Sequence, residues 1–370
     1  MIDRRLAQHI DVLLLVIVAT IVSMGVTTVY SATYAQAQSQ MSPLVWRQAV
    51  WAMGGAGLMF ALLLLDYRKL ERYAYAIYVA ALGLLVLVPL AGFLSGGSRR
   101  WIRLGFFALQ PSELAKLALV LALARFFHRD NAQGSYGANE IVVPVTLCAV
   151  PALLTLAQPD LGSAAVMGFV LVSVVLVAGL RLRVMATLAV VGVVGIFVAG
   201  QKLWTHLKPY QQKRILTFLN PEADPLGAGY HLIQSKIAVG SGMFWGKGFL
   251  HGTQNQLQFL PEQHTDFIFS VFAEEWGFVG CATLVVLYAA LILRGLQIVS
   301  RAKDRFGALV AFGVVSMIFW QAFVNIAMTT GLLPVVGITL PFFSYGGSSM
   351  ITLMLGIGLL LNVSMRRFTF

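Results

Sequence analysis

Long runs of apolar residues alternate with short polar segments along most of this 370-residue chain. Ten of the runs approach or exceed the ~20 residues that an α-helix needs to cross the hydrocarbon core of a bilayer. They lie at about 11–31, 45–65, 73–93, 108–127, 141–157, 162–180, 183–202, 266–293, 306–330 and 347–364. The pattern predicts an all-α integral membrane protein with ten transmembrane helices.

The composition is that of a membrane protein. Only 11% of the residues are charged and 58% are hydrophobic, with a mean hydropathy of +0.81, whereas soluble domains carry about 25% charged residues. The longest segment outside the apolar runs spans 203–265. We therefore expect residues 1–370 to form a single polytopic membrane domain, in which 203–265 is one large extracytoplasmic loop between the seventh and eighth helices.

Lys and Arg are distributed unevenly between the two sides of the predicted membrane domain. With both termini cytoplasmic, fifteen of them fall in cytoplasmic segments and four in the short outer loops. Positive residues are concentrated in cytoplasmic loops, so we predict a multi-pass protein with both termini cytoplasmic. This asymmetry also accounts for most of the net charge of +11. The chain has no basic patch on a soluble module, so nucleic-acid binding is not expected.

Ionisable residues at membrane depth are functional candidates, because the bilayer makes them costly. Glu113 and Lys116 lie three residues apart and share one face of the fourth helix. Either they neutralise each other inside the bundle or they serve a site. Asp160 follows Pro159 in "AQPDLGS", where capping of a turn is the alternative to a functional role.

The stretch "PEQHTDFIFSVFAEEWGFVG" carries four carboxylates beside an apolar run. Asp266 is predicted to head the eighth helix, where its carboxylate would gain from the helix dipole. Glu262 precedes it in the loop. Glu274 and Glu275 lie two or more turns deeper, and we expect them to pair within the bundle.

The loop 203–265 contains a predicted helix and a glycine-rich segment. The segment "GYHLIQSKIAV" has an apolar face when drawn as a helix, and Gln234 lies outside that face. This pattern is typical of a helix at the membrane interface. The following "GSGMFWGKGFLHG" lacks the spacing of a nucleotide-binding loop. It predicts a flexible loop that brings backbone amides and Lys247 close to an anion.

Two more segments point to a cavity on the outer side. "PFFSYGGSSM" interrupts an apolar region with Pro and Gly and leaves Ser344 near the outer surface. Irregular backbone at this depth is tolerated only where it is buried in protein or lines a wet cavity. "FLSGGSRRWIRLG" places Arg100 among three arginines on the side that the charge rule disfavours, although a simple interfacial anchor is the alternative.

Five stretches together resemble the SEDS family of shape, elongation, division and sporulation proteins. They are "LQPSELAKLALVLALARF", "AQPDLGS", "NPEADPLGAGYHLIQSKIAVGSG", "GTQNQLQFLPEQHTDFIFSVFAEEWG" and "LPFFSYGGSSM". They occur in order over most of the chain. "DPLGAGYH" and "HGTQNQLQFLPE" are more similar to the rod-shape branch of the family than to the division branch.

The resemblance implies a ten-helix peptidoglycan polymerase that acts on lipid II at the outer face of the bacterial cytoplasmic membrane. It implies that Asp266 is catalytic and that Glu113, Lys116, Asp160 and Arg100 line a central cavity. The implied partners are the nascent glycan strand, a class B penicillin-binding protein and other membrane proteins of the elongation complex. We add Lys247, Gln234 and Ser344 as candidate substrate-binding residues; they are predictions from the loops described above.

In such a reaction a carboxylate takes the proton of the acceptor 4-hydroxyl, and cationic groups stabilise the leaving pyrophosphate. An α-linked donor that yields a β-1,4 link requires one inverting displacement. No DxD-type metal motif is present, so no cofactor is certain, and Mg²⁺ or Mn²⁺ is the cation that the chemistry could use. A lipid II flippase and a structural scaffold are the alternatives from other functional classes.

Overall fold

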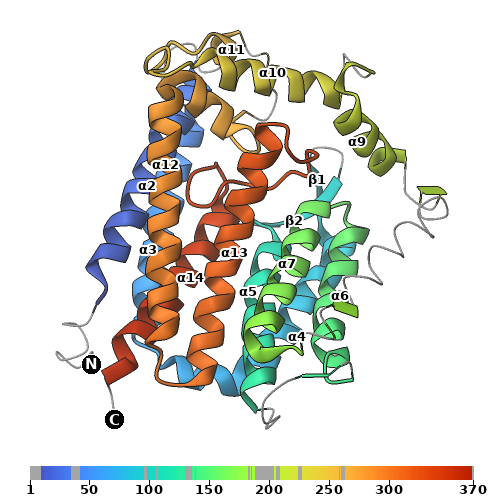
Figure 1. The fold of residues 1–370 in the computed structure, drawn as a ribbon, viewed down its shortest axis with the longest axis vertical. Coiled ribbons are helices and arrows are strands. Elements are labelled where there is room, and N and C mark those ends of the chain that lie inside the picture. Colours follow the sequence, from blue (N-terminus) through green and yellow to red (C-terminus); the bar gives the residue numbers. More distant parts are fainter. Residues whose placement is uncertain are drawn as a thin grey trace.

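The computed structural model describes residues 10–34, 42–95, 98–105, 107–129, 136–137, 139–181, 184, 186–187, 204–205, 209–223, 227–257, 259 and 263–368. Within them, nine of the ten predicted apolar runs form long helices (Figure 1). These are α2 (Val12–Tyr34), α3 (Pro43–Leu63), α4 (Tyr67–Ala91), α5 (Pro111–Arg129), α6 (Val142–Ala157), α7 (Leu161–Gly179), α12 (Ile268–Ser300), α13 (Arg305–Thr329) and α14 (Gly347–Met365). Most of the remaining run, 183–202, lies outside the described residues.

Six helices of the described part are long and apolar enough to cross a membrane: α2, α4, α7, α12, α13 and α14. The helices α3, α5 and α6 are not among the six, and for two of them the reason is visible in the sequence. The helix α6 has only 16 residues, and α5 carries Glu113 and Lys116 in its first two turns. The protein is therefore a mainly helical, multi-pass membrane protein, as the apolar pattern predicts.

The helices form one bundle in which α14 lies at the centre. Of the most apolar window of α14, 89% of the residues are buried, compared with 22% for α12. Both helices are apolar on all sides, so their burial is decided by their neighbours and not by an amphipathic pattern. α14 packs on α3, α5 and α13, whereas α12 packs on α2 and α13 at the edge of the bundle (Figure 1).

The segment "FLSGGSRRWIRLG" forms part of a small antiparallel sheet, which the sequence did not predict. Its strands are β1 (Phe93–Ser95), β2 (Ser98–Leu104) and β3 (Phe107–Leu109), in the order β1-β2-β3. Phe93 is paired with Trp101, and Ile102 with Leu109. β3 ends two residues before α5 begins, so the sheet fixes how the chain enters that helix.

The eighth predicted helix is broken. Gly277 has φ 61° and ψ −161° inside α12, so the helix consists of 268–276 and 278–300. Figure 1 shows the first part at an angle to the second. The prediction of one continuous helix over 266–293 was therefore wrong, because a regular apolar pattern does not reveal a glycine that leaves the helical region.

The loop before α12 contains α9 (Pro209–Leu219), η1 (Pro221–Ala223), α10 (Ala228–Ser241) and α11 (Thr253–Gln256). α10 confirms the short helix predicted in this loop. It packs against α12 and does not stand alone: the Ser235 hydroxyl lies 2.6 Å from the Ser270 hydroxyl and donates to the carbonyl of Thr329 at 2.6 Å. The last described element is the short η2 (Arg366–Phe368).

Candidate active site

The first turns of α5, α7 and α14 are joined by hydrogen bonds around Gln110. The Gln110 amide N–H donates to Ser348 Oγ at 2.9 Å, and its side-chain Nε2 donates to Asp160 Oδ2 at 3.2 Å. Ser348 donates in turn to the carbonyl of Ala108 at 3.0 Å. Because helix N-termini carry partial positive charge, this junction offers a favourable environment for an anion.

Asp160 is the N-cap of α7. Its Oδ1 accepts from the Ser163 N–H at 3.1 Å, and its Oδ2 also accepts from the Ser112 hydroxyl at 3.2 Å. The side chain is buried, at 2% exposure. The capping alternative is thus confirmed, and the same carboxylate also ties α7 to α5.

Arg100 on β2 binds the C-terminal end of α6, the helix before α7. Its Nε donates to the carbonyl of Gln158 at 3.1 Å, and its Nη2 donates to the carbonyl of Pro159. These carbonyls lie at the C-terminal end of α6, where an arginine can satisfy free backbone acceptors. Arg100 therefore lies directly beside the turn that carries Asp160.

Glu113 and Lys116 form the predicted pair. Lys116 Nζ lies 2.8 Å from Glu113 Oε1, and the side chains are 2% and 6% exposed, respectively. The second oxygen, Glu113 Oε2, is buried and has no hydrogen-bond partner among the described residues. A buried ion pair is retained only if its charges stay compensated, so this pair is sensitive to loss of either partner.

Asp266 lies in the turn 263–267, one residue before the N-cap Phe267. The prediction that Asp266 itself heads the helix was therefore off by one position. Asp266 is half-buried. Its backbone carbonyl accepts a hydrogen bond from Asn325 Nδ2 at 3.1 Å, and the same Nδ2 donates to the carbonyl of Ile338 at 2.6 Å.

Sequence reasoning missed Asn325. This residue is fully buried in α13, within the apolar run at 306–330. An amide at membrane depth must find hydrogen-bond partners, and that signal was present in the sequence. The partners, which are backbone carbonyls 59 and 13 residues away, were not.

Ser344 supports the Asp266 turn from the α13–α14 connection. Its hydroxyl donates to the carbonyl of Thr265 at 2.7 Å and accepts from the Leu340 N–H at 2.8 Å. The Tyr345 N–H donates to the carbonyl of His264 at 2.9 Å. Ser344 is 5% exposed, so its described contacts hold the backbone next to Asp266.

A single segment, 336–338, lies between Asp266 and the start of α7. Gly337 has φ 74°, and a Cβ on it would lie 3.3 Å from Asp266 Oδ2. On the other side, a Cβ on Gly162 would lie 2.6 Å from Ile338 Cγ1 and 2.9 Å from the carbonyl of Val336. Asp266 and the Asp160 cap thus flank the same stretch of chain.

Lys247 is placed elsewhere. Its Nζ lies 2.6 Å from Glu274 Oε1 and 2.7 Å from Thr253 Oγ1. Glu274 follows Asp266 by eight residues, which corresponds to about 12 Å at the helical rise of 1.5 Å per residue. The contact with Lys247 confirms that Glu274 pairs within the protein. Lys247 is not brought together with Asp266.

The glycine-rich loop is interlocked with the break in α12 and does not form a flexible anion cradle. The N–H groups of Lys247 and Gly248 donate to the carbonyls of Glu274 and Glu275, each at 3.0 Å. A Cβ on Gly242 would lie 2.0 Å from the carbonyl of Ala273. The prediction of a flexible loop was wrong: its amides bind backbone carbonyls and its glycines permit close approach.

Gln234 lies half-buried on α10, next to Ser235. Through Ser235, α10 packs on the part of α12 that follows Asp266.

Glu262, the other acid of the "PEQHTDF" stretch, lies outside the described residues. The structure therefore brings together Asp266 and Ser344 on one side of 336–338, and Asp160 and Arg100 on the other.

A model of the cell cycle proteins FtsW, RodA and SpoVE matches residues 11–368. This chain belongs to that family. It is 42% identical to the peptidoglycan glycosyltransferase MrdB of Escherichia coli (strain K12) over 97% of this chain and 94% of the relative.

Solved structures share the fold. A chain from a structure described as "Structural coordination of polymerization and crosslinking by a peptidoglycan synthase complex" matches with a TM-score of 0.82 and 36% identity, over 98% of this chain and 99% of that chain. The rod shape determining protein RodA of Thermus thermophilus matches with a TM-score of 0.71 and 34% identity, over 98% of both chains.

Proposed function

We propose that this protein is a peptidoglycan glycosyltransferase that adds the disaccharide-peptide of lipid II to a growing glycan strand during cell elongation, with Asp266 as its catalytic base. The relative named as a peptidoglycan glycosyltransferase, at 42% identity over almost the whole chain, supports the activity. The structural observation that carries the role of Asp266 is its placement. It is a half-buried carboxylate in a turn held by Asn325 and Ser344, beside Gly337.

Asp266 would take the proton from the 4-hydroxyl of the acceptor sugar as that oxygen attacks the anomeric carbon of the donor. The bond from the anomeric carbon to the lipid pyrophosphate breaks in the same step, so the configuration inverts from α to β. A positioned general base is typically worth about 10²–10⁴-fold in rate. A turn fixed by hydrogen bonds from two other segments keeps the carboxylate in place for this transfer.

The leaving pyrophosphate gains negative charge as the bond breaks. The joined starts of α5, α7 and α14 provide positive helix ends on the other side of 336–338, and such dipoles stabilise anions. Arg100 uses two of its five donors on the carbonyls of Gln158 and Pro159, which leaves donors for a phosphate oxygen. We assign substrate contact to Arg100, Asp160, Glu113, Lys116 and Gln234.

Two residues predicted to bind substrate receive other roles. Ser344 positions the Asp266 turn, because its hydroxyl is engaged by Thr265 and Leu340. Lys247 neutralises Glu274 at the break in α12.

A divalent cation is compatible with the site. The described residues contain no group of three metal-binding side chains, but Mg²⁺ is commonly held by one or two carboxylates together with phosphate oxygens of the substrate. Asp266 and the pyrophosphate of lipid II would form such a set. When bound, Mg²⁺ or Mn²⁺ would offset the charge of the leaving group.

We further propose ten transmembrane helices, both termini in the cytoplasm, 203–265 outside the membrane and the active site on the outer face. Ion pairs at the end of the bundle where α2 begins and α14 ends support this orientation: Arg294 contacts Asp11, and Arg366 contacts Asp66. Cationic residues gather at cytoplasmic ends. In this orientation the donor and the acceptor would both stay anchored in the membrane by their lipids while their head groups meet near Asp266.

We propose that a class B penicillin-binding protein, which crosslinks the new strands, is the partner, together with other membrane proteins of the elongation complex. The structural relative from a peptidoglycan synthase complex that coordinates polymerization and crosslinking supports such a pairing. The similarity to a rod shape determining protein supports a role in elongation.

The direct test supplies lipid II in detergent to the purified protein, alone and with a class B penicillin-binding protein, and separates the products on a gel. We expect glycan polymer with the wild type and at least ~10²-fold slower formation of polymer with Asp266→Asn. A flippase would move lipid II across vesicles without forming polymer. Absence of polymer under both conditions would contradict the proposed activity.

A further inference from the structure

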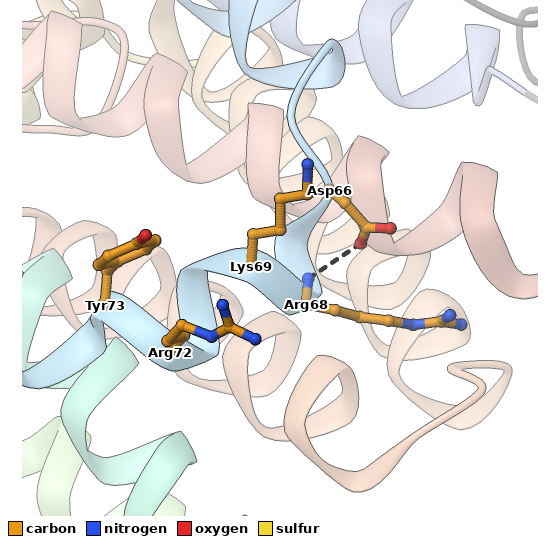
Figure 2. A pocket seen from close by; sticks show the side chains of 5 residues that line it. All are labelled: Asp66, Arg68, Lys69, Arg72 and Tyr73. Carbon is orange, nitrogen blue, oxygen red and sulfur yellow. Dashed lines mark hydrogen bonds between the residues drawn. The ribbon is translucent and has the colours of Figure 1, made fainter.

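A cavity of about 440 Å³ lies at the end of the bundle where α2 begins and α14 ends, away from Asp266. It is lined by Asp66, Arg68, Lys69, Arg72 and Tyr73, at the beginning of α4 (Figure 2). Three of these five residues are cationic. The catalytic proposal makes no use of this cavity.

The charges in the cavity are not all compensated. Asp66 caps α4 through the Arg68 N–H at 3.0 Å and lies 3.4 Å from Arg366. The Arg68 guanidinium lies 3.8 Å from Asp304. Lys69 and Arg72 are exposed, and their side chains have no hydrogen-bond or ion-pair partner among the described residues. Two positive charges therefore remain for an external anion.

The charged groups around the cavity do not cancel this excess. Glu71, the next carboxylate on α4, is engaged by Arg129 at 3.1 Å and by His128 at 3.6 Å. On the neighbouring α5, Arg125 donates to the carbonyl of Arg72 at 2.6 Å and adds a further cation. The potential at Lys69 and Arg72 is therefore positive.

Large exposed apolar side chains lie in the stretch of chain that leads into the cavity-lining residues. Leu64 and Leu65, in the turn before α4, are 61% and 52% exposed, and Phe60 on α3 is 47% exposed. Tyr73, which lines the cavity, is 57% exposed; tyrosine is typical of the level where a bilayer meets water. Exposed apolar and cationic side chains therefore follow one another within residues 60–73.

We propose that this cavity binds the phosphate head group of an anionic phospholipid. Lys69 and Arg72 contact the phosphodiester, Tyr73 lies at the glycerol level, and the acyl chains lie along Leu64, Leu65 and Phe60. Basic pockets beside transmembrane helices recognise anionic lipids in this way, with about 1 kcal/mol, or roughly fivefold in affinity, for each Lys or Arg near the surface. A water-soluble phosphate would use the cations but leave the apolar border without a role.

The test uses the purified full-length protein reconstituted in vesicles of equal parts phosphatidylglycerol and phosphatidylcholine. Native mass spectrometry after extraction in detergent compares the amounts of the two lipids that stay bound. We expect the wild type to retain phosphatidylglycerol preferentially. Lys69→Gln and Arg72→Gln should each reduce that preference about fivefold, and the double variant should abolish it.

The matched control is Arg301→Gln, which removes an exposed arginine at the same end of the bundle but outside the cavity. It should keep the preference of the wild type. An equal loss in Arg301→Gln would mean that only the general surface charge attracts the lipid, and would overturn the proposal. No preference in the wild type would also overturn it.

A second arm distinguishes the lipid from a soluble anion. Millimolar glycerol 3-phosphate is added to the detergent-extracted protein with phosphatidylglycerol bound. We expect the lipid to remain. Complete displacement by glycerol 3-phosphate would show that the cavity recognises a soluble phosphate, and would overturn the assignment to phospholipid.

Discussion

The side-chain amide of Asn325 donates to the backbone carbonyl of Asp266 at 3.1 Å. The two residues lie 59 positions apart, Asn325 within α13 and Asp266 in the turn before α12. Because the same amide also holds the carbonyl of Ile338, one buried side chain sets the spacing between the Asp266 turn and the segment 336–338. Asn325 therefore positions the carboxylate to which we assign the chemistry.

Substitution Asn325→Leu keeps the side chain close in size but leaves two backbone carbonyls without their donor. Each orphaned buried group costs roughly 1–3 kcal/mol, and the Asp266 turn loses its anchor. We expect a lower melting temperature and a loss of lipid II polymerisation, measured at a temperature where the variant is folded.

The matched control is Asn362→Leu in α14. Asn362 donates to the carbonyls of Leu62 at 2.8 Å and Leu65 at 2.6 Å, so the variant removes two bonds of the same kind far from Asp266, together with one that Asn362 Oδ1 accepts from Arg366 at 2.9 Å. It should be destabilised to a similar degree and still polymerise. Equal polymerisation defects in both variants would show that Asn325 acts on stability alone.

Asp266→Asn removes the proton acceptor and keeps the size of the side chain. Since Phe267 occupies the N-cap of α12, the substitution leaves the cap residue unchanged. We expect normal folding and a rate of polymerisation lower by at least ~10²-fold. Both are measured on purified protein, by thermal melting and by a gel assay with lipid II.

Two controls accompany this variant. Asp304→Asn changes the N-cap of α13, which accepts from the Gly307 N–H at 2.7 Å, at the opposite end of the bundle. Glu262→Gln changes the acid four residues before Asp266. Both should polymerise far better than Asp266→Asn. Near wild-type polymerisation by Asp266→Asn would remove Asp266 from the mechanism.

Glu113→Gln leaves Lys116 charged and buried without its partner. Breaking a buried pair in this way typically costs about 3–5 kcal/mol, so we expect a marked fall in melting temperature. The double variant Glu113→Gln/Lys116→Met removes both charges and should recover much of that stability. If the pair contacts substrate, the double variant stays inactive in the lipid II assay; recovery of polymerisation would make the pair purely structural.

Gly277→Ala tests the break in α12. At φ 61° and ψ −161° an L-residue is strained, and the new Cβ would lie 2.3 Å from the amide nitrogen of Gly246. We expect poor yield and a lower melting temperature in detergent. Gly83→Ala is the control, because a Cβ there meets nothing within 4 Å. Because Gly83→Ala removes a helical glycine, it should raise stability by roughly 0.5–1 kcal/mol. Equal melting temperatures for the two variants would contradict the close packing of the glycine-rich loop against Gly277.

The sequence by itself determined which segments become helices, because runs of apolar residues must satisfy their backbone internally in a bilayer. The start of α7 after Pro159, the Glu113–Lys116 pair and α10 also follow from local rules of capping and helical spacing. Five stretches, the one around Asp266 among them, identified the family. All of these signals lie within a few neighbouring residues or within one continuous stretch.

Other features were decided by contacts between distant segments. Nothing near Lys247 in the sequence says that its ammonium meets Glu274 and not a substrate, and nothing near Gly277 says that the helix breaks there. That break exists because Gly242 and Gly246 let a second backbone approach α12 closely, and the N–H groups of Lys247 and Gly248 bind its free carbonyls. The partners of Asn325 and Ser344 are likewise backbone carbonyls 59 and 79 residues away. Only tertiary packing decides such pairings, because a buried polar group bonds whichever partner the fold places beside it.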